Sequence, residues 1–445
     1  MERERLGSRL GFILLSAGCA IGCGNIWKFP WMTGQNGGGG FVLVYLLCLL
    51  ILGLPAMIME FALGRASQAS IVRMYHKLEK PGQKWHIHGY LALIGNICLM
   101  AFYTVVTGWM IYYFVQFLTG KTKDLGFVGM ITNPTVNVVY LAVAVVLGFF
   151  ILSFNLQSGL ERVTKILMTI LIILMLILAV RSILLPGAGK GLAFYLVPDF
   201  SKITPQVVVA AMNQAFFTLS LGIGSMAIFG SYLDKERSLM GESINIIALD
   251  TLVAIVAGLI IFPACFTYKL EVGAGPSLLF DTMATVFNNM VGGRFWGTLF
   301  FLFMTFAAFS TELAVFENIL AGIREMTGWS RKKGSFICAV GMFLISLTTA
   351  LGYSVLHFQP FAEGSAWLDF WDFIVSTNLL PIGALIFALF CCSDRFGWGW
   401  DNFIAEANAG KGMKVKGWMK PIFKYVVPIA VAVIYIIGLT SFQWK

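Results

Sequence analysis

Charged residues are scarce in this chain of 445 residues: only 12% are Asp, Glu, Lys or Arg, against about 25% in a typical soluble domain. With 58% hydrophobic residues, the chain has too few polar side chains to form the shell that a water-soluble domain needs. The composition therefore excludes an ordinary cytosolic enzyme, a disordered chain and a disulfide-stapled secreted domain. Charge-poor apolar runs of about 20 residues recur throughout instead, which predicts a polytopic membrane protein.

Motifs for catalysis and nucleotide binding are also missing. The chain has no G-x-S-x-G, no H-E-x-x-H and no Walker A sequence, and the glycine run NGGGG at 36–40 lacks the P-loop lysine. Neither an enzyme nor an ATP-driven transporter is therefore predicted. The eight cysteines all fall inside apolar runs and form no C-x-x-C, so we expect reduced thiols.

Histidine is rare as well, with four in the whole chain. We interpret His86 and His88 as marks of an interfacial segment rather than of a metal site. The net charge of +9 is better explained by an excess of Lys and Arg in cytoplasmic loops than by nucleic-acid binding. We therefore expect no nucleic-acid partner and no organic cofactor.

Eleven apolar spans are predicted. They lie near residues 10–34, 39–64, 88–118, 136–154, 163–185, 206–232, 244–268, 295–323, 336–355, 370–392 and 420–440. If the N-terminus is cytoplasmic, the loops on that side carry most of the 31 Lys and Arg residues, as the positive-inside rule requires. The prediction is a multi-pass protein of the cell membrane with a cytoplasmic N-terminus.

Glycines interrupt two of these spans at corresponding positions. Span 1 contains Gly18, Gly22 and Gly24 within SAGCAIGCGNIWKFPW, and span 6 contains Gly222 and Gly224 within FFTLSLGIGSMAIF. Spans 1–5 and 6–10 then form two similar sets of five helices, and because five is odd the second set is inverted in the membrane. Broken helices at matching positions of inverted repeats indicate a binding site near the bilayer midplane.

The predicted fold is an all-α polytopic membrane protein with a single transmembrane domain over 1–445. Its inverted repeats are expected at about 8–186 and 205–395, and an additional helix at about 420–440.

The interrupted backbone of span 1 supplies ligands of two kinds. The half-helix that starts near Cys23 and Gly24 presents free N–H groups and the positive end of a helix dipole, which suit a carboxylate. The carbonyls of residues 18–21, with Asn25 and Thr218, are hard oxygen ligands that suit a small cation. Sodium is the cation that fits such a site of low charge best.

Ser310 and Thr311 form a second group of oxygens in span 8. Hydroxyl side chains in a membrane helix mostly bond to their own backbone, so this pair alone does not identify a site. Charged residues inside apolar spans are costly and indicate function by default. Glu60 could accept hydrogen bonds from the amides of a broken helix, and Lys28 and Asp369 could pair as an outer gate. Buried or snorkelling ion pairs are the alternative for these residues and for Asp250, Glu312, Glu317 and Asp372.

Five stretches of the chain together resemble the neurotransmitter:sodium symporter family, in its prokaryotic, amino-acid-transporting branch. They are GSRLGFILLSAGCAIGCGNIWKFPW, GGGGFVLVYLL, GLPAMIMEFALGR, QAFFTLSLGIGS and FAAFSTELAVFEN. The resemblance extends over about residues 7–440. It implies a sodium-coupled symporter that imports a neutral, hydrophobic amino acid by alternating access, with two sodium ions and no chemistry on the substrate.

The resemblance also implies which residues form each part of the site. Sodium site one is expected to comprise Ala20, Asn25, Thr218 and Asp250. Sodium site two is expected to comprise Gly18, Ile21, Ala307, Ser310 and Thr311. The expected substrate-binding residues are Cys19, Ala20, Gly22, Cys23, Gly24, Leu99, Tyr103, Phe217, Thr218, Ser220, Ile223, Thr311 and Val315. The expected gates are Lys28 with Asp369 outside and Arg3 with Glu325, steadied by Tyr232, inside.

Chloride is expected to be dispensable. Tyr45, Gln214 and Thr218 match positions that hold an anion in chloride-dependent relatives, but Asp250 stands where those relatives have Asn. A fixed carboxylate there would supply the negative charge and repel chloride. Gly22 lies where amine-transporting relatives carry a carboxylate, so we expect a whole amino acid as the substrate rather than a decarboxylated amine.

Two departures from the family pattern stand out. Lys28 occupies a position where the family often has Arg, and the usual Gly-x₉-Pro of span 5 is missing, since Thr169 follows Gly159 at that spacing. A membrane-embedded enzyme and an amino-acid sensor without flux stay open as alternatives. The choice of amino acid, the stoichiometry and the oligomeric state are not predicted.

Overall fold

The computed structural model describes residues 4–122, 125–271, 275–361 and 364–440. Within these ranges the chain is almost wholly helical and forms no β-strand beyond one isolated bridge between Arg237 and Lys411. This confirms the predicted all-α fold. All eight cysteines are buried and free.

The α-helices are the following. They are α1 (Arg9–Ala20), α2 (Phe29–Gln35), α3 (Gly39–Cys48), α4 (Leu54–Ser67), α5 (Ile71–Leu78), α6 (His86–Thr119), α7 (Phe127–Ile131), α8 (Pro134–Leu152), α9 (Arg162–Ile183), α10 (Ala188–Leu196), α11 (Pro205–Thr218), α12 (Ser225–Gly230), α13 (Leu239–Tyr268), α14 (Ala284–Asn289), α15 (Gly293–Thr327), α16 (Arg331–Ala350), α17 (Trp367–Asp372), α18 (Leu380–Cys392), α19 (Trp400–Ala407) and α20 (Val427–Thr440). Short π-helical segments join several of them, at Gly24–Lys28, Leu49–Gly53, Gln157–Glu161, Leu278–Met283, Phe373–Leu379 and Ile422–Val426.

Nine helices in the described part of the chain are long and apolar enough to cross a bilayer. The pair Arg9–Ala20 and Gly24–Gln35 forms a further crossing that is bent by 54° at its break. The predicted sixth span is covered by α11 and α12, neither of which is long enough to cross alone. Spans 1 and 6 are thus both broken, as predicted, and the total of eleven crossings stays a prediction.

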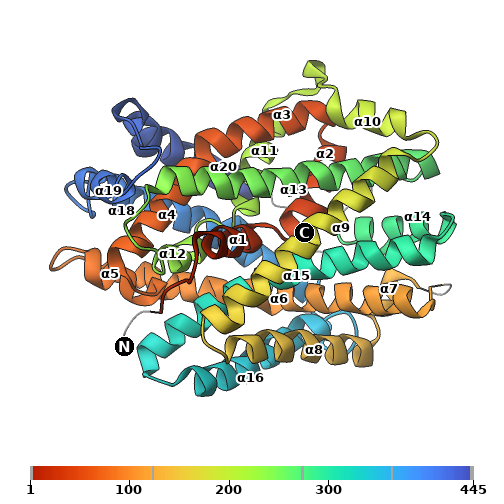
Figure 1. The fold of residues 1–445 in the computed structure, drawn as a ribbon, viewed down its shortest axis with the longest axis horizontal. Coiled ribbons are helices and arrows are strands. Elements are labelled where there is room, and N and C mark those ends of the chain that lie inside the picture. The colour runs from red at the N-terminus through yellow and green to blue at the C-terminus, as the bar shows by residue number, and fades with distance from the viewer. Residues whose placement is uncertain (1–3, 123–124, 272–274, 362–363, 441–445) are drawn as a thin grey trace.

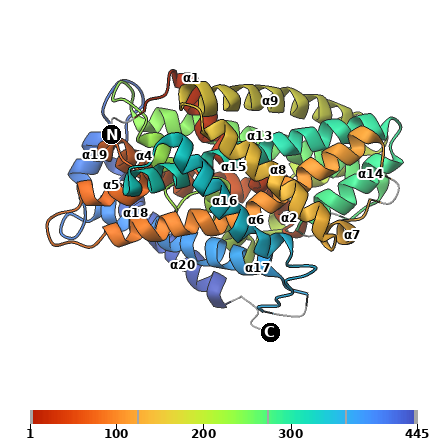
Figure 2. The ribbon, with the colours of Figure 1, turned by 90° about the horizontal axis from the view of Figure 1, so that it is seen from below.

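The long helices lie side by side in one bundle (Figure 1). α6 and α15 pack along each other, and α8 and α16 pack against them. In both ribbon views α5 and α19 lie at one end of the bundle, and α7 and α14 lie at the other (Figures 1 and 2). The breaks of spans 1 and 6 therefore lie within the bundle, between two charged ends.

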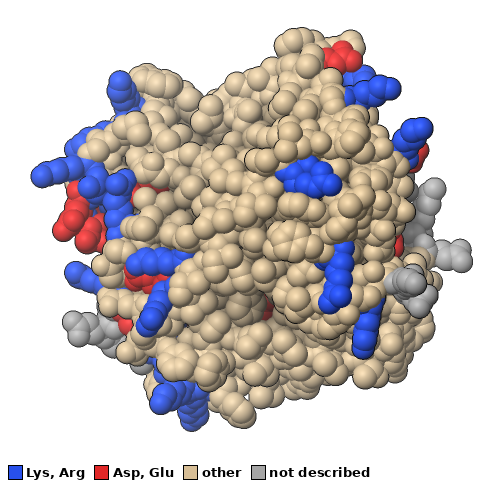
Figure 3. Space-filling model, turned by 45° about the vertical axis from the view of Figure 1, so that its right-hand side comes forward, with Lys and Arg blue, Asp and Glu red and all other residues tan. Residues whose placement is uncertain are grey.

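The surface matches a protein that sits in a bilayer. Figure 3 shows a broad surface with few charged side chains: basic and acidic side chains gather toward its left edge, and a few separate basic ones lie over its right half. Large apolar side chains such as Phe150 and Ile429 are more than 60% exposed on the flanks of their helices. Exposed apolar area of this extent is typical of a lipid-facing surface. The protein is therefore a multi-pass membrane protein.

Several helices begin with a side-chain cap. The Ser8 hydroxyl accepts a hydrogen bond from the Gly11 N–H, and the Thr204 hydroxyl accepts one from the Val207 N–H. Pro205 follows Thr204 at the first helical position, where its missing N–H costs nothing. These caps fix the entry points of the two broken spans.

Span 5 starts earlier than predicted. Helical structure begins at Gln157 and continues through α9 to Ile183. Residues 157–161 are too polar to be assigned to an apolar span from the sequence. In the structure the Glu161 carboxylate accepts hydrogen bonds from Gly7 and Ser8 and pairs with Lys165 at 2.6 Å. Glu161, the charged residue of this polar start, is therefore paired inside the fold, whereas Gln157 and Ser158 are exposed.

Candidate binding site at the two broken helices

The break in span 6 depends on backbone conformations that side chains disfavour. Ser220, Gly222 and Gly224 have φ values of 51°, 105° and 72°, and only glycine adopts this left-handed region without strain. The freed N–H groups of Gly222 and Met226 donate to the two carboxylate oxygens of Glu60 at 2.5 and 3.3 Å. This is the arrangement expected for Glu60 from the sequence.

Asn96 also supports this break, and sequence reasoning missed it. Its side-chain N–H donates to the carbonyl of Ile223 at 2.8 Å, and its amide oxygen accepts from Asn318 at 3.0 Å. The only sequence feature that could have pointed to Asn96 is that it is an uncharged polar residue within an apolar span. Such a residue is easily passed over because most polar residues in membrane helices bond only to their own helix.

The two breaks face each other. A Cβ atom on Gly24 would lie 3.3 Å from the Phe217 ring and 3.4 Å from the Cα of Thr218. The Gln214 side chain donates to the Gly24 carbonyl at 2.8 Å. The close approach of α11 therefore explains why position 24 is glycine and brings unwound backbone from both spans into one site.

The five residues expected for sodium site two converge. The Ser310 hydroxyl lies 3.1 Å from the Gly18 carbonyl and 2.9 Å from that of Ala307. The Thr311 hydroxyl lies 3.1 Å from the carbonyls of both Gly18 and Ile21. Buried carbonyl and hydroxyl oxygens in one small volume are the ligands that a hard cation prefers.

Three of the four residues expected for sodium site one are bonded to one another. The Asn25 side chain donates to the Asp250 carboxylate at 2.8 Å, and the Thr218 hydroxyl lies 3.3 Å from that carboxylate. The Gly22 N–H donates to the Asn25 amide oxygen at 3.1 Å. The fourth residue, Ala20, is the last residue of α1.

Two buried polar atoms beside this group have no hydrogen-bond partner among the described residues, the Tyr45 hydroxyl and the Gln214 amide oxygen. Asp250 is close enough to Tyr45 to act on it electrostatically. Unpaired buried polar atoms are costly, so these two atoms are candidates to face a bound ion or ligand beside Asp250.

The backbone N–H group of Cys23 lies on the other side of Gly22. The Cys23 N–H donates to the Tyr103 hydroxyl at 3.2 Å. A Cβ atom on Gly22 would lie 2.4 Å from that hydroxyl and 2.5 Å from the Thr311 hydroxyl. The site therefore has no room for a side chain at position 22.

Apolar side chains expected to surround the substrate are buried on the helices that flank the breaks. Leu99 lies on α6, Ile223 lies in the break of span 6, and Val315 lies on α15. Ser220 donates to the Cys19 carbonyl at 3.3 Å. These residues come from elements that pack together, as the resemblance implied.

The predicted outer ion pair is not formed. Lys28 Nζ lies 3.5 Å from the centroid of the Phe217 ring, a cation–π contact, and Asp372 is the carboxylate whose charge acts on it. Asp369 instead caps the start of α17 by accepting the Ala366 N–H at 2.7 Å. The expectation of a Lys28–Asp369 pair is thus corrected: the free amide at the start of α17 takes up the Asp369 carboxylate.

The predicted inner gate is only partly described. Arg3 lies outside the described residues. The Glu325 carboxylate accepts from the Ser70 N–H at 2.9 Å and from its hydroxyl at 2.6 Å. The Tyr232 hydroxyl donates to Glu317 at 2.8 Å.

An ion-pair network at this end was missed by sequence reasoning. Arg331 donates to both oxygens of Glu317, at 3.2 and 2.5 Å. Glu4 lies 3.3 Å from Arg324 and 3.4 Å from Arg331. Burial raises the pKa of Glu4, but Arg331, a hydrogen bond from Leu156 and Arg324 outweigh it, so the pKa is lowered overall. The sequence signal was hidden because basic residues after span 8 look like ordinary loop charge.

Comparison with known proteins identifies the family. The model of the sodium:neurotransmitter symporter family matches residues 3–127 and 122–445. An uncharacterized sodium-dependent transporter of Bacillus subtilis is 34% identical over 98% of both chains. A sodium- and chloride-dependent taurine transporter of Bos taurus is 24% identical, over 99% of this chain and 79% of its own.

A solved structure is also similar over nearly the whole chain. It is the crystal structure of MhsT in complex with L-phenylalanine, with a TM-score of 0.88 and 35% identity over 98% of this chain and 100% of the other. The curated relatives are transporters rather than enzymes, as predicted. This chain therefore belongs to the sodium:neurotransmitter symporter family and is a sodium-dependent transporter.

Proposed function

We propose that the protein imports a neutral, hydrophobic amino acid together with sodium, by alternating access and without a need for chloride. The observation that carries the proposal is the convergence of carbonyl oxygens, hydroxyls and free amides between two broken helices. The bound L-phenylalanine of MhsT supports an amino acid as the substrate.

Two sodium ions are proposed, one at each group of oxygens. The Ser310 and Thr311 hydroxyls now point their hydrogens at backbone carbonyls. Rotation of those hydrogens would turn oxygen lone pairs toward an ion in the same place. Asp250, Asn25 and Thr218 would hold the other ion, and the substrate carboxylate would complete its ligands. Each ion would then stabilise the bound substrate, which is how an inward sodium gradient would drive uptake.

The substrate carboxylate is proposed to meet the amides of Cys23 and Gly24 and the Tyr103 hydroxyl, at the positive end of a half-helix. Leu99, Ile223 and Val315 would contact its apolar side chain. A bare amine should bind poorly because position 22 offers no acid to pair with its ammonium group.

Alternating access requires that the two ends of the bundle open in turn. We propose that the end with α5 and α19 is cytoplasmic, since Arg73, Lys77, Lys80 and Lys84 gather in and after α5. The network of Arg331, Glu317 and Glu4 would then close the cytoplasmic side, and the aromatic lid of Phe217 with Lys28 would close the outside.

A thermal-shift panel tests the substrate. The twenty amino acids, with tyramine and tryptamine as amine controls, are added to purified protein in sodium chloride or in potassium chloride. We expect apolar amino acids to raise the Tm only when sodium is present. Stabilisation by tyramine or tryptamine as large as that by the parent amino acids would contradict the assignment.

Uptake in sodium gluconate against sodium chloride tests the role of Asp250. Two anions a few ångströms apart repel by several kcal/mol at an effective dielectric near 20, so the Asp250 carboxylate should exclude chloride. Wild type is expected to be indifferent to chloride, and Asp250→Asn with Ala254→Ser to lose flux and regain part of it with chloride. A wild type that stops in gluconate would refute the assignment.

A further inference from the structure

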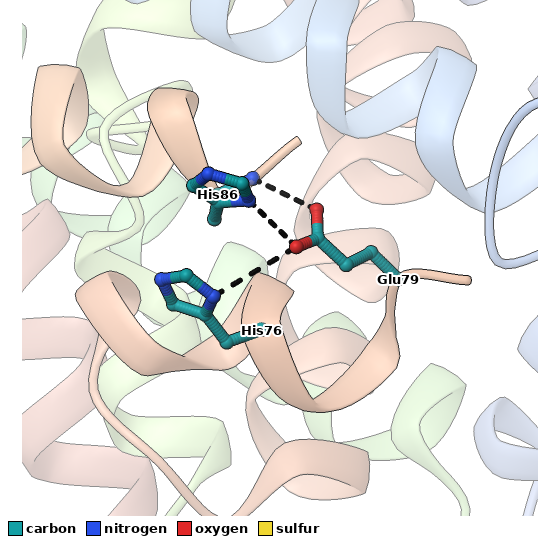
Figure 4. A group of neighbouring side chains, drawn as sticks. All are labelled: His76, Glu79 and His86. Atoms are coloured by element: carbon teal, nitrogen blue, oxygen red, sulfur yellow. Dashed lines mark hydrogen bonds and ion pairs between the residues drawn. The ribbon is translucent and has the colours of Figure 1, made fainter. Parts of the chain in front are cut away.

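Away from the transport site, three potential metal ligands meet at the end of the bundle that holds α5. Figure 4 shows His76 near the end of α5, Glu79 directly after that helix, and His86 at the start of α6. Both imidazoles are turned toward the Glu79 carboxylate. The ligand atoms of the three side chains all lie within 4.8 Å of one another.

The three side chains already contact one another without an ion. His86 Nδ1 lies 2.6 Å and His76 Nδ1 lies 3.8 Å from Glu79 Oε1. The two imidazole rings are stacked with centroids 4.4 Å apart. Zinc binds histidine nitrogen at about 2.0–2.1 Å and carboxylate oxygen at about 2.0–2.2 Å in a tetrahedral site, so its ligand atoms lie roughly 3.3 Å from one another. To bind one ion, His86 would move slightly away from Glu79, His76 would move closer to it, and the stacked imidazoles would turn so that both Nδ1 atoms face the ion.

The surroundings leave the cluster open to an ion from solution. The side chains of His76 and His86 are 44% and 28% exposed, whereas that of Glu79 is 10% exposed. A cleft of about 460 Å³, which Arg73 and Tyr90 also line, borders His76 and leaves this ligand accessible to solvent. Two imidazoles with one carboxylate and open positions suit zinc and similar divalent transition metals.

Neighbouring lysines do not oppose the ion directly. Lys77 Nζ donates to the Ser67 carbonyl at 2.9 Å, and Lys80 Nζ donates to the Asp394 carbonyl at 2.8 Å. The nearby His88 is occupied elsewhere, because its Nδ1 is bonded to the Tyr75 hydroxyl at 2.7 Å. The sequence analysis treated His86 and His88 alike, as marks of an interfacial segment. In the structure His86 contacts Glu79, whereas His88 bonds to Tyr75.

We propose that His76, Glu79 and His86 form a binding site for a zinc-class divalent metal ion, which ties the end of α5 to the start of α6. Glu79 already bridges this turn, since its second oxygen accepts the His86 N–H at 3.1 Å. A bound ion would add His76 to that link and restrain residues 80–85. The site is independent of the proposed substrate.

Zinc titration of the full-length protein in detergent, with any affinity tag removed, tests the proposal. Calorimetry is expected to show one zinc ion per chain, and zinc to raise the Tm. His76→Ala with His86→Ala should weaken binding by at least about tenfold and abolish the Tm shift. His357→Ala is the matched control, because His357 is exposed and belongs to no described metal cluster, and it should bind like wild type.

Cobalt provides an independent readout of the same ligands. Bound Co²⁺ should give visible absorption bands in wild type and in His357→Ala, and should lose them in the double variant. Glu79→Gln keeps an acceptor for the His86 N–H but removes the charge, so it should fold normally and bind zinc more weakly. Equal zinc affinity in wild type and the double variant, or a loss of binding in His357→Ala, would overturn the site.

Discussion

Glu60 and Glu312 are both buried carboxyl groups in membrane helices, but their surroundings differ. Glu60 accepts two backbone hydrogen bonds from the break of span 6. Neither oxygen of Glu312 has a hydrogen-bond partner among the described residues, and the nearby Thr107 hydroxyl bonds to the Tyr103 carbonyl. The sequence marked both residues as charges in spans and predicted amide partners for Glu60, but it gave no account of Glu312, because the surroundings of Glu312 come from distant helices.

Replacing each by glutamine should separate these environments. Glu60→Gln turns an N–H donor toward backbone N–H groups, so it should lower the free energy of unfolding by about 1–3 kcal/mol. Glu312→Gln breaks no bond and removes a group that is costly to ionise, so it should be neutral or stabilising. The Tm of both variants in the same detergent checks this. Equal losses of Tm would show that Glu312 has a stabilising partner after all.

A methyl group at position 22 should disable the binding site. The Cβ atom of Gly22→Ala would lie within 2.5 Å of the hydroxyls of Tyr103 and Thr311, and overpacking of this kind costs about 1–3 kcal/mol. We expect the sodium-dependent Tm shift by substrate to be lost. Gly341→Ala is the control, because nothing lies within 4 Å of its Cβ position. Unchanged substrate binding in Gly22→Ala would contradict the assigned site.

At the scale of elements, the breaks of spans 1 and 6 could be predicted because glycine and polar residues interrupt otherwise continuous apolar runs. The boundary of span 5 could not, since the polar residues Gln157–Glu161 are paired with the N-terminal segment. The network around Arg331 was missed for the same reason. Its ion pair joins α16 to α15, and hydropathy contains no information on which loop charge folds inward.

Removing one partner of that buried pair should be costly. Arg331→Met leaves the Glu317 carboxylate buried with only Tyr232 as a described partner of its side chain, and breaking such a pair typically costs about 3–5 kcal/mol. Arg331→Met with Glu317→Gln should recover much of the lost Tm, since no unpaired charge remains. Lys333→Met, an exposed residue nearby, should have little effect. Strictly additive losses in the double variant would mean that the two residues are not coupled.

At the scale of the whole molecule, composition and loop charge predicted a multi-pass all-α protein, and the interrupted spans indicated where a binding site is expected. The ligand groups proposed for that site came from family resemblance. The structure brings together the five residues expected for one ion and three of the four expected for the other. The predicted Lys28–Asp369 ion pair is not formed, because Lys28 contacts the Phe217 ring and Asp369 caps the start of α17. Competition between such partners depends on distances of a few ångströms, which a residue pattern does not specify.

Sodium-driven accumulation is the measurement that tests the central claim most directly. Purified protein is reconstituted into sealed vesicles and supplied with the radiolabelled amino acid that gives the largest Tm shift. We predict accumulation of unmodified substrate above its outside concentration under an inward sodium gradient, and loss of that accumulation when sodium is equal on both sides or when Thr311 is changed to Ala. Saturable binding without accumulation, or uptake indifferent to the sodium gradient, would contradict the account.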